Sequence, residues 1–285
     1  MIRQLALALG VLTTVAATVY AGEQDNIHSI KSDLVVPLVA DEKPAAGKRV
    51  RLTLPEYEGG KLFHVLYLPP EWEAGRKYPI LVEFPGNGGY QNKYGDKSTG
   101  RVEDCKLGYG ISGGRGFIWV CLPFVDPKSK SHALTWWGDP DATAAYCRAA
   151  VGQACENFGG DSKAVVLTGF SRGALACGYI GLRDDETAKL WRAMIAHSHF
   201  DGVRKWDYPE SDEASARRRL ARWNGRPLYL SHEGTVDDSV RFLKTCRIEA
   251  TFRVLPYPNH TDEWVLKDIP ERAGLRKWLA EVLRN

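Results

Sequence analysis

The chain has 285 residues, of which 44% are hydrophobic, 26% charged and 11% aromatic, a composition that excludes disordered, collagen-like and coiled-coil proteins. Lysine and arginine number 38 and aspartate and glutamate 35, so the formal net charge of +3 provides no electrostatic basis for nucleic-acid binding. A chain of this length can bury the core of one large domain.

The N-terminus has the pattern of a secretory signal peptide. Arg3 precedes an uncharged, largely apolar run over residues 5–19, and Val19 and Ala21 place small residues at the −3 and −1 positions of a cleavage site. The run is shorter than the about 20 apolar residues that a membrane anchor needs. We therefore expect residues 1–21 to be a removed signal peptide and the protein to be secreted or periplasmic, with no membrane span after cleavage.

Export would expose the six cysteines to an oxidising compartment, in which disulfides can form. Six cysteines allow 15 pairings, among which the sequence cannot choose. One pair is excluded, because Cys147 and Cys155 lie in a helix-like stretch whose rise separates them by about 12 Å. No C-x-x-C pair occurs, which argues against zinc ribbons and thioredoxin chemistry.

The predicted elements follow a polar leader over residues 22–48. Residues 49–54 and 61–68 alternate with period two and predict a hairpin. Alternating strands and helices come next, and they predict one α/β domain over residues 49–285, with a mostly parallel sheet covered on both faces. Strands are expected at 78–84, 116–122, 164–167, 193–196, 227–230 and 250–255, and helices at 142–158, 172–182, 213–223, 237–246 and 271–283.

Ligands of such sheets bind outside the carboxyl ends of the strands, and a candidate nucleophile stands at one of them. Gly169-Phe-Ser171-Arg-Gly173 fits G-x-S-x-G, between a predicted strand and a predicted helix. Composition alone would give roughly 0.1 matches in this chain. A strand-to-helix turn of this tightness needs both glycines and lifts the serine oxygen above the sheet edge, so Ser171 is the candidate nucleophile.

A serine nucleophile needs a base, and chain position selects His260. His28 lies in the leader, His64 lies within the hairpin and His132 precedes the serine, whereas His260 follows the last predicted strand. The acid should lie between serine and histidine in the chain. The segment Ser231-His-Glu-Gly-Thr-Val-Asp-Asp supplies it after a strand, with Asp237 as the choice and Asp238 and Glu233 as alternatives.

With these residues in this order, the sequence resembles the α/β-hydrolase family, in particular secreted serine esterases of the esterase D and feruloyl or acetylxylan esterase type. The resemblance covers about residues 49–285. It implies the α/β-hydrolase fold with an N-terminal hairpin, and acyl transfer to water without a cofactor or metal. Ser171 would attack the carbonyl, His260 would act as base and then acid, and Asp237 would orient the imidazole. The residues that carry it are Tyr67-Leu-Pro-Pro70, residues 79–89, the turn around Ser171, Gly234-Thr-Val-Asp237 and His260.

The resemblance also implies an oxyanion hole. Its backbone N–H donors would be Arg172, directly after the nucleophile, and Asn87, in a glycine-rich loop after a strand. This chain departs from the family pattern at Pro85 and at Glu233, where the family has histidines. The second departure keeps Asp238 open as the acid.

Two further clusters are candidates for substrate binding. Trp136 and Trp137 lie in a long loop and either pack on the core or line a cleft. His199 belongs to His197-Ser-His-Phe-Asp201, which could be read as a metal site, but strand alternation leaves only one residue between the histidines and no third ligand is evident. Polar contacts to substrate or to the fold are therefore expected there.

The leading hypothesis is a secreted serine esterase acting on carbohydrate-linked esters, whether small molecules or polysaccharides. Three observations favour a carbohydrate ester over a lipid: the expected export, the aromatic and polar residues of the loops, and a lid segment at 203–222 that is charged rather than apolar. A small serine peptidase resembling the prolyl oligopeptidase catalytic domain is the alternative enzyme. A non-catalytic, ligand-binding α/β-hydrolase homologue is the alternative outside enzymes.

Overall fold

The central sheet determines the layout of the molecule. In a computed structural model that describes residues 25–284, nine strands pair in the order β1-β2-β3-β7-β4-β10-β11-β12-β13. Only β3 runs antiparallel to its neighbours. The predicted signal peptide lies outside the described residues. The strands are β1 (Val39–Ala40), β2 (Arg49–Leu52), β3 (His64–Tyr67), β4 (Tyr78–Phe84), β7 (Ile118–Cys121), β10 (Gly160–Phe170), β11 (Ala193–His197), β12 (Leu228–His232) and β13 (Thr251–Val254).

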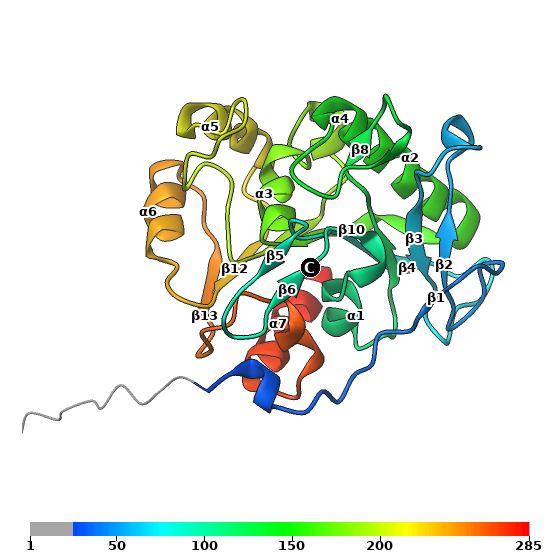
Figure 1. Cartoon of the computed structure of the whole chain (residues 1–285), viewed down its shortest axis with the longest axis horizontal. Helices are drawn as coiled ribbons and strands as arrows, with labels where there is room; N and C mark the ends of the chain where they lie inside the picture. The colour runs from blue at the N-terminus through cyan, green and yellow to red at the C-terminus, as the bar shows by residue number, and fades with distance from the viewer. Residues whose placement is uncertain (1–24, 285) are drawn as a thin grey trace, which may run out of the picture.

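Helices cover both faces of this sheet (Figure 1). One hydrophobic cluster packs α2 (Pro140–Phe158), α3 (Arg172–Tyr179), α5 (Glu213–Leu220) and α6 (Asp237–Thr245) against one face. A second cluster packs α1 (Leu107–Ser112) and α7 (Pro270–Arg284) against the other. Strands such as β7 are buried along their whole length because both of their faces are covered, which explains their continuous apolar sequences. The predicted mostly parallel α/β sheet is confirmed.

The loops contain short elements that were not predicted from the sequence. Two-residue strands form hairpins after β4, as β5 (Tyr90–Gln91) with β6 (Lys97–Ser98), and after β7, as β8 (Val125–Asp126) with β9 (Ser131–His132). Because both hairpins follow strands, they stand at the carboxyl edge of the sheet. The remaining short helices are α4 (Asp185–Ala188), η1 (Ile27–Ser29), η2 (Pro55–Tyr57), η3 (Val102–Asp104), η4 (Ala221–Trp223) and η5 (Glu263–Leu266).

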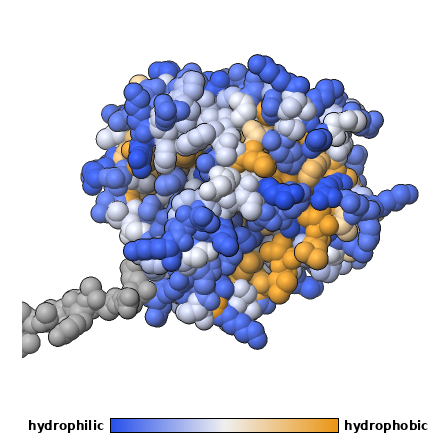
Figure 2. Space-filling model, viewed as in Figure 1, coloured by the Kyte–Doolittle hydropathy of each residue, from blue (hydrophilic) through white to orange (hydrophobic). Residues whose placement is uncertain are grey.

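The polar leader is part of the domain. Ile27 is completely buried, β1 pairs in parallel with β2, and the Asp33 carboxylate accepts two 2.7 Å hydrogen bonds from the Arg272 guanidinium of α7. The leader also carries exposed apolar side chains, Val35 at 81% and Leu38 at 92% exposure. Hydrophobic surface is visible in Figure 2 where Figure 1 draws the leader crossing the molecule.

All six cysteines are free thiols, four of them buried. Within residues 25–284, no helix is both long enough and apolar enough to cross a membrane.

Candidate active site

The turn between β10 and α3 holds Ser171 in an unusual backbone conformation. Ser171 has φ 55° and ψ −116°, a positive-φ conformation that side-chain-bearing residues rarely adopt. The glycines on either side permit it: a Cβ at Gly169 would collide with the Gly173 backbone, and one at Gly173 would collide with the Phe84 carbonyl. The two glycines of the motif therefore allow α3 to pack against the end of β4.

His260 contacts the serine directly. Its Nε2 lies 3.0 Å from Ser171 Oγ, and its side chain is 15% exposed. Its ring centroid lies 5.0 Å from that of Tyr90 and 4.9 Å from that of Phe170. The structure thus brings together the predicted nucleophile and base.

The carboxylate that contacts His260 is Glu233, which corrects the prediction of Asp237. Glu233 follows the last residue of β12, and its Oε1 lies 2.5 Å from His260 Nδ1. Asp237 instead begins α6 with an exposed side chain that makes no hydrogen bond to His260, and the equally exposed Asp238 pairs with Arg241. Glu233 stands directly at the end of β12, whereas Asp237 lies four residues further on, at the first position of α6.

The surroundings of Glu233 favour its ionised form. Its Oε2 accepts a 2.6 Å hydrogen bond from Ser198 Oγ at the end of β11. Burial raises the pKa of the carboxyl, but the hydrogen bond to His260 and the neighbouring imidazoles outweigh burial, so its pKa lies well below the ordinary value. An ionised carboxylate can only accept, so His260 Nδ1 carries a proton and Nε2 is left to accept the proton of Ser171.

Two backbone amides are candidates for binding an oxyanion. Arg172 is the first residue of α3, where helical N–H groups lack intrahelical partners. Asn87 lies in the loop after β4, which the close approach of Gly173 to Phe84 brings to the same helix end. In the part of the chain that the structure describes, neither amide donates a backbone hydrogen bond. Neither predicted donor is therefore committed to another backbone acceptor, as an oxyanion-hole amide must not be.

The Arg172 side chain has a role that the sequence did not reveal. It is 1% exposed, stacks over Phe124 at 4.0 Å, and donates hydrogen bonds to the carbonyl oxygens of Trp136, at 2.7 Å, and Ala133, at 3.2 Å. Burial lowers the pKa of this guanidinium to about 9. Arg172 therefore ties the loop after β7 to the nucleophile turn.

That loop carries the two predicted tryptophans, and the structure separates them. Trp136 is 37% exposed, and its ring lies 5.8 Å from that of Trp206. Trp137 is 4% exposed and packs 4.8 Å from Tyr179 in the core, so its prediction as a substrate contact is corrected. Trp136 has positive φ, and this turn directs consecutive side chains to different environments.

His199, predicted as a substrate contact, lies beside the candidate triad. Its ring centroid is 5.3 Å from those of both His260 and Trp206. Burial, followed by the charge of His260, lowers the pKa of His199 to about 4, so its imidazole is neutral near pH 7. Trp136, Trp206 and His199 together form an aromatic rim on one side of the triad.

The neighbours of His199 have separate structural partners. His197 is fully buried between Ser231 Oγ and the Thr261 carbonyl, at 3.0 Å from each, and Asp201 forms a buried ion pair with Arg219 at 2.9 and 3.1 Å. His197, His199 and Asp201 thus do not converge on one point.

One other group of potential metal ligands occurs among residues 25–284, namely Glu83, Cys105 and Cys121. The Glu83 oxygens are already occupied by four N–H donors. These come from the backbone of Lys106, Leu107 and Gly108 and the ring of Trp119. The carboxylate caps the start of α1 and is not free to bind an ion.

Comparisons with known proteins identify the fold. No protein-family model and no curated sequence matches the chain. Among solved structures, a candidate dipeptidyl aminopeptidase IV from Bacteroides ovatus superposes with TM-score 0.58 at 14% identity, covering 82% of this chain but 35% of that one. The chain thus spans about a third of the length of this structure.

Two esterase structures match over most of their length. A Rhizomucor miehei esterase superposes with TM-score 0.54 at 12% identity, covering 84% of this chain and 85% of that one. An acetyl ester-xyloside bifunctional hydrolase from Caldicellulosiruptor lactoaceticus superposes with TM-score 0.52 at 13% identity, covering 83% and 97%. This chain therefore has the α/β-hydrolase fold.

Proposed function

We propose that this protein is a serine hydrolase that cleaves carboxylic esters through an acyl-enzyme on Ser171. The observation that carries the proposal is the continuous chain of contacts from Glu233 through His260 to the Ser171 hydroxyl, at 2.5 and 3.0 Å. Each contact has the direction that nucleophilic catalysis needs, because Glu233 accepts from Nδ1 and leaves Nε2 free to accept from Oγ.

In the acylation step, Oγ of Ser171 bonds to the ester carbonyl carbon while its proton passes to His260 Nε2. The carbonyl oxygen becomes an oxyanion, to which the amides of Arg172 and Asn87 would donate. The bond to the alcohol oxygen then breaks, and Nε2 returns the proton to that oxygen. Water repeats the sequence on the acyl-enzyme, releasing the acid and restoring the Ser171 hydroxyl.

We further propose a carbohydrate-linked ester as substrate and an exported protein, as the residue 1–21 pattern suggests. Trp136 and Trp206 offer apolar faces next to the neutral His199, and a sugar presents both an apolar face and hydroxyl groups. The segment that follows Trp206 includes α5, whose apolar residues Ala216 and Leu220 are buried and whose exposed side carries Glu213 and Arg218 in place of the apolar surface that a lipid interface requires. The likeness to an esterase and to an acetyl ester-xyloside hydrolase supports ester cleavage at the level of the fold.

A peptidase is the second candidate, favoured by the likeness to the Bacteroides ovatus structure. A substrate panel distinguishes the two: an acetylated or feruloylated sugar, a long-chain acyl glycerol and a dipeptidyl amide, at matched concentrations. We expect the highest kcat/KM on a sugar ester. A preference for the long acyl chain would contradict the carbohydrate proposal, and a preference for the amide would favour the peptidase.

Labelling with a fluorophosphonate, which reacts with activated serines, tests the catalytic proposal itself. The wild-type protein should become labelled on Ser171, and Ser171→Ala should remain unlabelled while keeping its fold. A folded wild-type protein that is not labelled would instead support a non-catalytic, ligand-binding role.

A further inference from the structure

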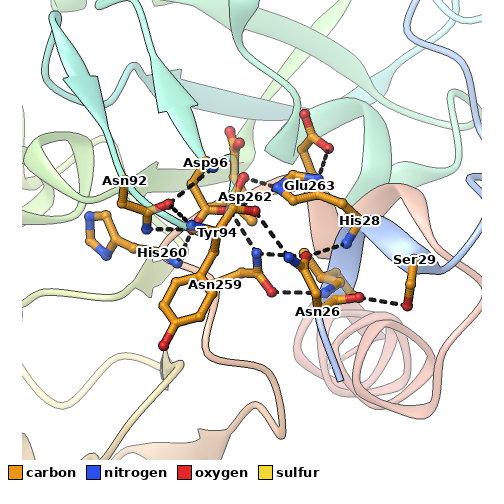
Figure 3. A network of polar contacts seen from close by, with 12 residues as sticks. Asn26, His28, Ser29, Asn92, Tyr94, Asp96, Asn259, His260, Asp262 and Glu263 are labelled. Atoms are coloured by element: carbon orange, nitrogen blue, oxygen red, sulfur yellow. Dashed lines mark hydrogen bonds and ion pairs between the residues drawn. The ribbon is translucent and has the colours of Figure 1, made fainter. Parts of the chain in front are cut away.

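A buried carboxylate joins three parts of the chain that are distant in the sequence, one of which carries His260 (Figure 3). Asp96 lies in the turn between β5 and β6 and is completely buried. Its neighbours come from the leader, at residues 26–28, and from the loop that carries His260. None of these contacts was predicted from the sequence.

The two oxygens of Asp96 accept four hydrogen bonds from these segments. Oδ2 accepts from the backbone N–H of His260 at 2.8 Å and from Asn92 Nδ2 at 2.7 Å. Oδ1 accepts from Asn259 Nδ2 and from His28 Nε2, both at 2.8 Å. A buried carboxylate with all its acceptor sites in use is held in one geometry, because losing any partner would leave a charge poorly solvated.

The leader contacts the histidine loop on both sides of His260. Before it, Asn259 Oδ1 accepts a 2.7 Å hydrogen bond from the backbone N–H of Ile27, and Asn259 Nδ2 donates one of 3.0 Å to Asn26 Oδ1. After it, Glu263 lies 3.2 Å from His28 Nδ1, the ring nitrogen that does not face Asp96. The leader and the β5–β6 turn thus fix the backbone on either side of the imidazole.

We propose that Asp96, with Asn26 and His28 of the leader, forms a clamp that positions His260 for catalysis. The inference rests on the proposed function. The clamp acts on the His260 backbone, while Glu233 and Ser171 contact the ring. A displacement of about 1 Å in a catalytic group can lower the rate about 100-fold, so fixing the Cα of His260 has catalytic value. The segment just after the predicted signal peptide therefore supports the active site.

The leader provides its own control for this inference. The Asp33 carboxylate attaches the leader to Arg272 through two 2.7 Å hydrogen bonds, and it makes no hydrogen bond to residues 259–263. Asp33→Asn weakens an ion pair between leader and body without touching the clamp. Asp96→Asn keeps the side-chain volume but replaces an accepting oxygen with an amide nitrogen that cannot accept. His28→Ala removes one donor from a side chain that is 29% exposed, and it should fold normally.

The experiment follows both the rate and the final extent of fluorophosphonate labelling in the full-length protein. In Asp96→Asn, we expect each chain to become labelled completely but about 10- to 100-fold more slowly, with a matching loss of kcat and an unchanged KM for a soluble ester. His28→Ala should slow labelling about threefold to tenfold. Asp33→Asn should label at the wild-type rate and show only a lower Tm.

Other outcomes separate the clamp from the proposed function. If the clamp residues only stabilise the fold, Asp96→Asn and His28→Ala would label incompletely, and the labelled fraction would react at the wild-type rate. Complete labelling at the wild-type rate in both variants would equally overturn the inference. A wild-type protein that neither labels nor hydrolyses any ester would overturn the proposed function first.

Discussion

Two turns at the carboxyl edge of the sheet supply the ends of the candidate triad, and different features position them. The turn from β10 to α3 holds Ser171 through its backbone, with positive φ at the serine and helix–strand packing that only glycine allows at 173. The turn from β12 to α6 holds Glu233 through its side chain, by hydrogen bonds from Ser198 and His260.

This difference explains why the sequence selected a single residue at the nucleophile end of the candidate triad but left three carboxylates open at the acid end. A backbone-determined position requires particular residue types at fixed spacing, so it leaves a motif in the sequence. A position determined by side-chain contacts requires only that a carboxylate reach the histidine. Glu233 reaches it from the end of the strand, four residues before Asp237. A carboxylate at either position could meet this requirement, so the sequence alone does not distinguish them.

The largest expected effect comes from replacing the candidate acid residues by their amides, one at a time. Glu233→Gln keeps the side-chain shape but removes the charge and can place a donor against Nδ1–H, favouring the wrong imidazole tautomer. We expect kcat to fall by about three to four powers of ten in Glu233→Gln and by less than about threefold in Asp237→Asn. Steady-state kinetics on a soluble aryl ester measures both.

The matched control is Asp238→Asn, which removes an exposed partner of Arg241 and should retain activity. An inactive Asp237→Asn beside an active Glu233→Gln would show that the contact at 2.5 Å is not the catalytic one. The acid, like the serine, would then be the residue that the sequence motif predicts, and the two turns would no longer differ in how they position their residues.

The sequence predicted the strands and helices that build the core, because their apolar runs must be buried on both faces. It missed α1 and the hairpins after β4 and β7, which are too short to show a periodicity. It also missed that the polar leader packs on the body. Asn26 and His28 have no distinctive local pattern, and their partners lie more than two hundred residues away at Asn259 and Glu263.

A smaller effect on kinetics is expected from replacing Trp136, the residue of the aromatic rim that the nucleophile turn holds in place. The Arg172 side chain fixes the carbonyl of Trp136, whose ring is partly exposed, while Trp137 is buried. Trp136→Ala should raise KM for a sugar ester about threefold to tenfold and leave KM for a small aryl acetate unchanged, because only the sugar reaches the rim. Trp137→Ala should instead lower the free energy of unfolding by about 3 kcal/mol. An equal KM change on both substrates in Trp136→Ala would contradict sugar binding at the rim.

The smallest effect concerns His199, whose ring lies between the two turns, near His260 and His232. Its folded-state pKa of about 4 lies below the ordinary 6.5, so between these values the unfolded chain binds a proton that the folded chain does not. The contribution of His199 therefore makes the free energy of unfolding rise with pH across this window. This contribution is lost as pH falls through about 4. His64 and His197, also near 4, act in the same direction, whereas Glu83 at about 7 and Asp201 at about 6, raised by burial, act in the opposite direction.

Comparison with a variant isolates the contribution of His199 from these other groups. His199→Gln should reduce the slope of unfolding free energy against pH by about 1 kcal/mol per pH unit near pH 5, relative to the wild type, with no change in slope above about pH 7. Urea unfolding at a series of pH values measures both slopes. An unchanged slope near pH 5 would mean that His199 takes up its proton in the folded protein as readily as in the unfolded chain. The imidazole beside the triad would then be solvated and charged in mild acid, and a role as a neutral contact for substrate hydroxyl groups would hold only at higher pH.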